Sequence, residues 1–496
     1  MFAVRMNHRN GQCRREKQRL RDMPETKSQG CLRCLNMGLK CPGARTDAFF
    51  VHTVVDAAAT MGTLKPRDEI SLLPTSANKR LLLRLPAPQP SPAGALDQLF
   101  VSHFIDNFFG AFRPSLPVPG GSSRIWLHEL PQFLASDSPS PVQSSIRAAS
   151  MLSYGTAVGD ASIKTEACVW YMRALQSLRL LLSRNGSLAS PEVSVCAAVM
   201  LIHFETLAGT SPRAWLKHVR GAASLLEEQG PERCRTGFLH QIFSHLRLQT
   251  FVAAMAANEL HAFASPEWTT IPFEIQPKLI FDRLVDILFG VQRCLSIASR
   301  LISSKSDQRD LLKHELALSI QDARLQIRQW RSETLSYASR KNGQQYHEAS
   351  ESVADAQIAA SADDLHFMLP YSDIASAALV TLYDAANVIV LRLLCLVFPG
   401  AASHNARIQH HSESILSAHA MIKQSSCSVP GRSSIMLVQQ LKTVALWSPS
   451  ARQRALAIRM LQGQQSQNRG FADISAPSNQ YFAHVAEHIL NGYSVD

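Results

Sequence analysis

Residues 190–231, SPEVSVCAAVMLIHFETLAGTSPRAWLKHVRGAASLLEEQGP, carry one helix-boundary pattern twice. Each half opens with a serine that can cap a helix, followed by a proline suited to the first helical turn. An apolar-rich segment follows, and a glycine ends it, as is common at helix C-termini. The stretch therefore predicts two consecutive helices joined by a tight turn. Their boundaries are Ser190, Pro191 and Gly209 for the first helix and Ser211, Pro212, Gly230 and Pro231 for the second.

Helical spacing of apolar residues continues on both sides of this stretch. In LDQLFVSHFIDNFFGAF, residues 96–112, Leu96, Phe100, Phe104 and Phe108 recur every four residues and are expected to line one face. Alternating patterns typical of strands are absent from the sequence. We therefore predict an all-α fold.

The longest apolar run is AANVIVLRLLCLVF, residues 385–398. It is too short to span a bilayer, and Arg392 interrupts it. We predict a buried helix here and no association with a membrane.

Composition divides the 496 residues into three regions. Residues 1–46 are basic and cysteine-bearing, residues 47–94 form an irregular linker that ends in LPAPQPSPAG, and residues 95–496 form the helical body. Residues 1–45 hold eleven Lys and Arg against three Asp and Glu, a charge of +8, which leaves +3 of the net +11 for the rest. This basic head suits a polyanionic partner. The polar stretch at 342–357 is expected to form a mobile loop within the body.

Ten cysteines are too few for a disulfide scaffold in a chain of this length. The N-terminus lacks the apolar segment of a secretory signal, so we expect a reducing intracellular compartment in which clustered cysteines bind metal. Six scattered cysteines are interpreted as core thiols: Cys168, Cys196, Cys234, Cys294, Cys395 and Cys427. The other four, Cys13, Cys31, Cys34 and Cys41, are clustered, and a CxxC turn can place two sulfurs on one zinc ion.

This head resembles the fungal binuclear zinc-cluster family, whose six cysteines run CxxC, six residues, C, a proline-containing loop, and the same pattern again. Cys31, Cys34 and Cys41 match the second half, and CRREKQRLRD, residues 13–22, matches the basic helix of the first half. The first half is eroded, because Asn10 and Leu20 stand where the family has cysteines.

The resemblance implies specific roles for these residues. Since a bridging cysteine is lost, one zinc ion is expected rather than two, bound by Cys31, Cys34 and Cys41 with Cys13 as the fourth ligand; His8 or water is an alternative fourth ligand, and a head without zinc is a further one. On duplex DNA, Lys17 would contact base edges, whereas Arg14, Arg19 and Arg21 would contact phosphates. The alternative from the residues alone is a solvated basic tail that binds nucleic acid nonspecifically.

A second resemblance lies in the body. LAGTSPRAWLKHVRGAASLLEEQGP (207–231) and PEWTTIPFE (266–274) resemble the regulatory domain that follows the zinc cluster in one branch of the same family. Within the first segment, Trp215, His218 and Gly221 are interpreted as helix-packing residues, with Gly221 allowing close approach.

These resemblances predict a nuclear, DNA-binding regulator of RNA polymerase II genes. The alternative is a helical interaction protein or co-regulator that has lost sequence-specific DNA binding. The expected partners are duplex DNA and either a second copy of the chain or other transcription regulators. The motifs GxxxxGKS/T, GxGxxG, HExxH and GxSxG were not found, so no enzyme is predicted. Asp363 with Asp364 is interpreted as a solvated helix start, and the pairs His240 with His245 and His410 with His411 as structural or exposed residues.

Overall fold

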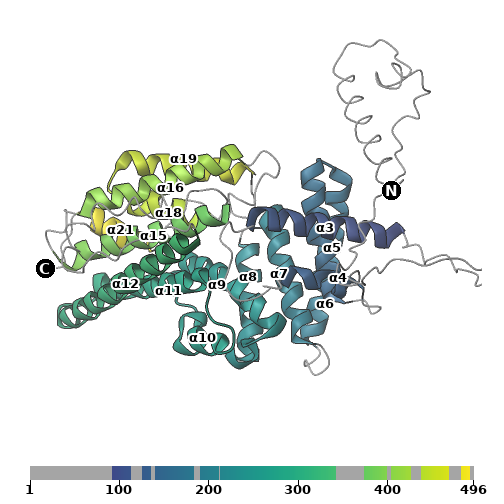
Figure 1. Cartoon of the computed structure of the whole chain (residues 1–496), viewed down its shortest axis with the longest axis horizontal. Coiled ribbons are helices and arrows are strands. Elements are labelled where there is room, and N and C mark those ends of the chain that lie inside the picture. Colours follow the sequence, from purple (N-terminus) through teal and green to yellow (C-terminus); the bar gives the residue numbers. More distant parts are fainter. Residues whose placement is uncertain are drawn as a thin grey trace, which may run out of the picture. The chain divides into compact units, whose positions relative to one another are not determined.

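The computed structural model describes residues 92–112, 126–135, 140–183, 190–211, 213–341, 374–398, 404–425, 437–467 and 482–491. This part of the chain is helical and contains no strand (Figure 1), which confirms the predicted all-α fold. The first described helix begins at Pro92, three residues before the predicted start of the body. The head (1–46), most of the linker (47–94), the stretch at 342–357 and the Asp363–Asp364 pair lie outside the described residues.

The first group of helices is arranged around α5. This helix packs against α3, α6 and α7, and α7 packs in turn against α8. A capping box between Ser140 and Gln143 begins α5, and Gly159 ends it in the left-handed conformation with φ of 76°. The group consists of α3 (Pro92–Phe112), η2 (Trp126–Glu129), α4 (Leu130–Leu134), α5 (Pro141–Val158), α6 (Ala161–Ser183), α7 (Pro191–Ala208) and α8 (Ala214–Gln229).

The two helices predicted from residues 190–231 are present as α7 and α8. Pro191 begins α7, and Gly209 ends it with φ of 54°. The start of α8 differs from the prediction, because Arg213, with φ of 61°, immediately precedes the helix instead of Ser211. Gly230 ends α8 as predicted, with φ of 79°, a conformation that favours glycine.

The second group is centred on α15, which packs against α11, α12, α16 and α18. Helix α9 connects the groups, since it packs against α7 and α8 and also against α11. The elements are η3 (Pro231–Cys234), α9 (Gly237–Ala257), η4 (Ala262–Ala264), α10 (Pro266–Thr270), η5 (Ile271–Phe273), α11 (Ile280–Ser303), α12 (Ser306–Lys341), α15 (Ile374–Val397), α16 (Asn405–Ser425), α18 (Val438–Trp447), α19 (Ala451–Gln467) and α21 (Ala483–Leu490).

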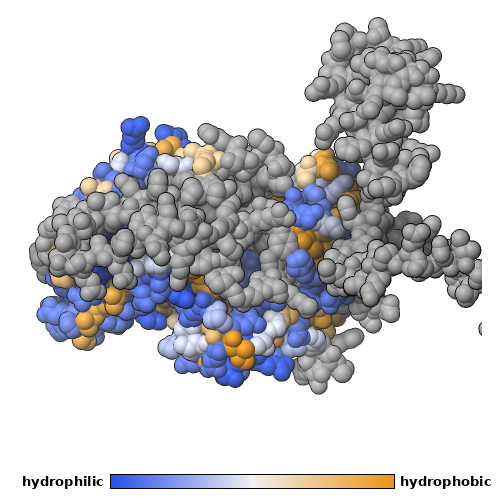
Figure 2. Space-filling view, in the orientation of Figure 1, coloured by the Kyte–Doolittle hydropathy of each residue, from blue (hydrophilic) through white to orange (hydrophobic). Residues whose placement is uncertain are grey.

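One hydrophobic core runs through both groups. Two of its helices, Pro191–Ala208 and Ala377–Val397, are long and apolar enough to cross a membrane by length and composition. In the fold they are core helices, with 61% and 94% of their apolar windows buried. The buried helix predicted at 385–398 is thus confirmed as the C-terminal part of α15. Where Figure 2 colours the visible face of the body by hydropathy, it is largely hydrophilic, with scattered hydrophobic patches.

Two of the predicted core positions are exposed in the fold. Phe100 and Phe104 are buried on α3, but Leu96 is 41% exposed, because a four-residue repeat rotates by about 40° per step on an α-helix. On α6, Cys168 is exposed, since it is turned by about 100° from the buried Ala167.

The remaining scattered cysteines behave largely as predicted. Cys196, Cys234 and Cys294 are buried, and Cys395 is half-buried. Cys427 lies outside the described residues.

Candidate functional site

The predicted zinc and DNA residues all lie outside the described part of the chain. They are Cys13, Cys31, Cys34 and Cys41, with Arg14, Lys17, Arg19 and Arg21. The structure therefore does not place them relative to one another. Within the described residues, no group of three or more His, Cys, Asp or Glu side chains could hold a metal ion. Functional chemistry in the body must be sought in other polar clusters.

A buried polar cluster joins α6, α7 and α8 around Glu205. The Tyr171 hydroxyl donates to Glu205 Oε1 at 2.5 Å, and the Thr210 amide and hydroxyl donate to the same carboxylate at 2.8 and 2.5 Å. His218 Nε2 lies 3.1 Å from the Tyr171 oxygen. Because that hydroxyl donates its proton to Glu205, it accepts from His218. The Tyr171 ring also stacks on Phe204, with centroids 4.2 Å apart.

The electrostatics of this cluster follow from its burial. Glu205 has no exposed surface. Burial raises the pKa of Tyr171, and the Glu205 carboxylate raises it further. Burial lowers the pKa of His218, although the charge of Glu205 opposes this shift. The cluster therefore gathers the Tyr171, Thr210 and His218 side chains around Glu205, an arrangement that connects three helices.

The packing role predicted for residues on α8 is confirmed for two of the three. Trp215 is buried, and His218 contacts Tyr171. Gly221 does not allow close approach, because it is exposed and a Cβ built there would meet nothing within 4 Å. That part of the prediction was wrong, since the packed face of α8 runs through its neighbours Val219 and Ala222.

A second cluster places a fully buried arginine between α9 and α11. Arg247 Nη1 donates to the Asp282 carbonyl at 3.0 Å and lies 3.5 Å from its carboxylate, while Nη2 pairs with Asp286. Lys278 Nζ reaches the other Asp286 oxygen at 2.5 Å. The Arg247 guanidinium lies 5.0 Å from the Phe273 ring centroid. Burial raises the pKa of Asp282, and the Arg247 charge opposes that shift.

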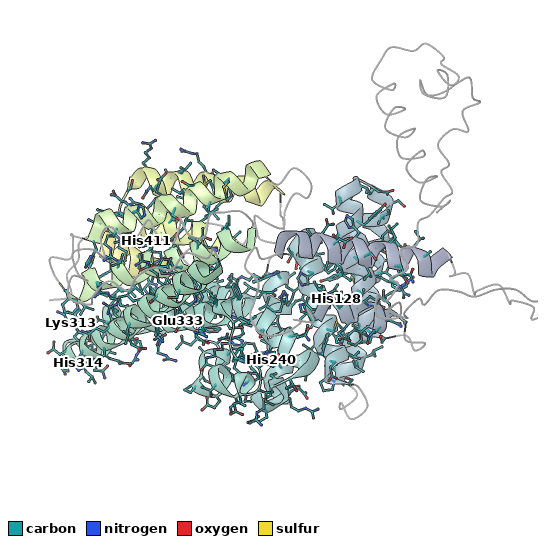
Figure 3. The ribbon with its side chains drawn as sticks, viewed as in Figure 1. His128, His240, Lys313, His314, Glu333 and His411 are labelled. Atoms are coloured by element: carbon teal, nitrogen blue, oxygen red, sulfur yellow. The ribbon has the colours of Figure 1, made fainter. Side chains whose placement is uncertain are left out.

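A third cluster joins α15 to α16 around Asp384. His411 Nδ1 donates to Asp384 Oδ1 at 2.8 Å, and the Ser414 hydroxyl donates to Oδ2 at 2.6 Å. These residue types occur in hydrolase triads, where the serine contacts the histidine rather than the acid. Here the serine contacts the aspartate, so the histidine is not placed to activate it. Figure 3 shows His411 within the second group of helices.

The predicted histidine pairs separate into buried and exposed members. His240 Nδ1 lies 2.9 Å from the Cys234 carbonyl oxygen, which ties α9 to η3 (Figure 3). His245 packs against Trp126, with ring centroids 5.2 Å apart. His411 is buried against Asp384, whereas His410 is exposed. The prediction that these four residues are structural or exposed is confirmed.

Acid is expected to destabilise the body through His245. Burial lowers its pKa from 6.5 to about 4, so between pH 6.5 and 4 the unfolded chain takes up a proton that the folded chain excludes. The folded state keeps this stability above pH 6.5 and loses roughly 3 kcal/mol of it by pH 4. Urea unfolding at several pH values should show a smaller acid loss in His245→Phe than in the wild type. His410→Phe, at an exposed ring, is the control and should keep the wild-type dependence. An unchanged pH dependence in His245→Phe would contradict the assignment.

Sequence reasoning missed the residues at the centre of these clusters. Glu205, Arg247 and Asp384 are charged residues within helices, and each stands among apolar neighbours in the sequence. That context was the available signal, because a charge within an apolar stretch is rarely buried unless it is paired. The partners Tyr171 and Asp282 come from distant segments and carry no such signal.

Known proteins resemble parts of this chain. The pattern described as "Fungal specific transcription factor domain" matches residues 98–436. A segment of 105 residues is 34% identical to uncharacterized protein AN5342 of Emericella nidulans. It covers 21% of this chain, and the chain spans 22% of that relative's length. No solved structure matches the chain. Because the family pattern covers more than half of the chain, including α5 to α16, this protein belongs to the fungal specific transcription factor domain family, whose members regulate transcription.

Proposed function

We propose that this regulator binds duplex DNA through residues 1–46 and acts in the nucleus on RNA polymerase II genes. The observation that carries the proposal is the combination, in one chain, of a family regulatory body at 98–436 with a basic cysteine-bearing head. Eight of the eleven net positive charges lie in the first 45 residues. A cation-rich segment binds the phosphate backbone by releasing counterions, which supports a nucleic-acid partner for the head.

The donor set of the head fits one zinc ion. Cys31, Cys34 and Cys41 supply three sulfurs, and two of them stand in a CxxC spacing that suits a single tetrahedral ion. Cys13 is the fourth cysteine of the head and completes a four-sulfur set. Four sulfurs are too few for two zinc ions in the manner of the six-cysteine family, so the proposal is one ion per chain. Bound zinc would supply the folding free energy that the small head cannot obtain from a core.

Zinc content tests this ligand set. The purified full chain is expected to retain about one zinc ion, and Cys34→Ser is expected to lose it, because three thiolates hold the ion far less tightly than four. Cys168→Ser removes an exposed thiol from α6 and is the matched control, with unchanged zinc. Metal analysis after dialysis is the measurement. Two tightly held ions, or full zinc in Cys34→Ser, would overturn the assignment.

The roles of the basic residues can be separated by binding titrations on the full chain. Lys17→Ala is expected to cost roughly 1–3 kcal/mol on the preferred guanine- and cytosine-rich site and little on a scrambled duplex. Arg14→Ala, Arg19→Ala or Arg21→Ala should weaken both duplexes alike and lower the salt slope by about one unit each. Titrations on both duplexes at two salt concentrations distinguish these effects. Equal weakening of both duplexes by Lys17→Ala would remove the base-reading role.

The second candidate function is a co-regulator that binds other transcription regulators through its helical body. Asn10 and Leu20, which replace two cysteines of the family pattern, favour it. A head that shows only salt-dependent, sequence-independent DNA binding in the titrations above would support this candidate over the first.

A further inference from the structure

Arg392 on α15 is a buried cation whose hydrogen bonds are incomplete. The residue is 6% exposed, and its Nε donates to the Trp447 carbonyl oxygen at 2.7 Å. Its Nη1 lies 3.5 Å from Asn405 Oδ1, which is a long contact, and its Nη2 has no hydrogen-bond partner among the described residues. A buried charge is normally paired, because its removal from water is costly. Arg392 therefore lacks the counter-charge that its burial requires.

The structure buries a second arginine, Arg247, and pairs it differently. Arg247 contacts the carboxylates of both Asp282 and Asp286. In the part of the chain that the structure describes, no carboxylate contacts Arg392, which has only a carbonyl and an amide oxygen as acceptors. Asp384, a carboxylate on the same helix, already accepts from two side chains of α16. The missing partner of Arg392 is thus an anion.

Helix α18 offsets only part of this positive charge. The carbonyl end of a helix carries about half a negative charge, and here two arginines share it. Arg392 donates to the last carbonyl of α18, and Arg454 Nη1 donates to the Ser448 and Pro449 carbonyl oxygens at 2.8 and 3.1 Å. Burial lowers the pKa of Arg392, the Cys395 sulfur opposes this shift, and the positive charge of Arg454 adds to it.

The start of α16 places more positive charge beside Asn405. Burial lowers the pKa of His404, and the charges of Arg407 and Arg324 lower it further, so both guanidinium groups lie near this ring. The first-turn amides of a helix also carry partial positive charge and have no acceptor within the helix. Helices α15, α16, α18 and α19 pack together in this group (Figure 1). Positive groups from several elements therefore gather around one helix junction.

We propose that the junction of α15, α16, α18 and α19 binds a small doubly charged oxyanion, a phosphate or a dicarboxylate, at Arg392. Nη1 and Nη2 of a guanidinium can donate together to two oxygens of such a group, while Nε keeps its bond to α18. Asn405 is half-buried, so its carboxamide can turn to admit the anion and donate to it through Nδ2. Arg407 and the first amides of α16 supply further positive charge. An uncharged ligand would leave the buried cation unpaired.

A bound anion would stabilise the packing of α16 and α18 against α15, because it binds the folded body and not the unfolded chain. The junction would then be an effector site of the regulatory body. This proposal does not depend on the DNA-binding role of the head.

Calorimetric titration of the full chain tests the site, with inorganic phosphate and malonate as separate probes. The wild type should show saturable binding of at least one of them, and Arg392→Gln should weaken that binding at least about tenfold, which corresponds to one lost charge-assisted hydrogen bond. Arg220→Gln, at an exposed arginine of α8, is the matched control and should bind like the wild type. Sodium chloride at equal ionic strength controls for screening. Binding of only one probe identifies the source of the oxyanion.

Thermal unfolding distinguishes a ligand site from a packing role of Arg392. The bound probe should raise the melting temperature of the wild type and of Arg220→Gln but not that of Arg392→Gln. Circular dichroism shows whether Arg392→Gln folds; if it does not, Arg407→Gln, at a half-buried position, should weaken binding severalfold and decides the test. The proposal is overturned if neither probe binds saturably up to about 10 mM. It is also overturned if the deciding variant binds like the wild type, since the ions are then held elsewhere, as on the basic head.

Discussion

Arg247→Leu is expected to lower the free energy of unfolding by about 3–5 kcal/mol. The guanidinium is fully buried, and its loss leaves the buried Asp282 carboxylate without its cation. The Asp286 carboxylate keeps only the Lys278 contact. Removing one member of a buried pair is costly because the other charge stays out of water, whereas the pair as a whole need not be strongly stabilising. Urea unfolding followed by circular dichroism measures the effect.

Two further variants test whether the loss of stability in Arg247→Leu arises from the burial of its ion pairs. Arg220→Leu removes the exposed Arg220–Glu259 pair, with an N–O distance of 2.9 Å, and should cost under about 1 kcal/mol. Adding Asp282→Asn to Arg247→Leu should recover part of the loss, since the amide oxygen can still accept from the Leu279 amide without a charge. A loss in Arg247→Leu no greater than in Arg220→Leu would refute the central role given to this cluster.

Glu205→Leu is the second substitution with a large expected effect. It removes the common acceptor of the Tyr171 hydroxyl and the Thr210 amide, and leaving the buried Tyr171 hydroxyl without this acceptor costs about 1–3 kcal/mol. The Tyr171 hydroxyl is held by the packing of α6, whereas Thr210 lies exposed between α7 and α8, where its amide can turn to water. Chemical denaturation of the full chain measures the loss.

A double-mutant cycle identifies the source of that loss. Tyr171→Phe alone should be milder, because Glu205 keeps both Thr210 contacts. The double variant Tyr171→Phe/Glu205→Leu should lose less than the sum of the single variants, because no tyrosine hydroxyl is left unpaired. Strict additivity would show that the short contact between the two side chains contributes nothing to stability.

The sequence predicts the helices of this body better than it predicts their contacts. Caps and glycines around α7 are local signals, and they placed that helix correctly. The position of Leu96 was wrong because a four-residue repeat drifts around the helix, and the role of Gly221 was wrong because a glycine does not specify which neighbour approaches it. The polar clusters depend on pairs such as Tyr171 with Glu205, 34 residues apart, which only the tertiary fold brings together.

The position of α15 in the fold has a consequence for how the protein can be shortened. Its apolar surface is covered by α11 and α12, which precede it, and by α16, α18 and α21, which follow it. The family pattern ends at residue 436, before α18 and α21 begin. A chain cut at that point would lose Phe482, whose amide donates to Asn258 Oδ1 at 2.7 Å. It would also expose to solvent part of α15, a helix apolar enough to cross a membrane. Such a fragment is a candidate for aggregation and chaperone capture, so the unit recognised in the sequence is shorter than the unit that folds.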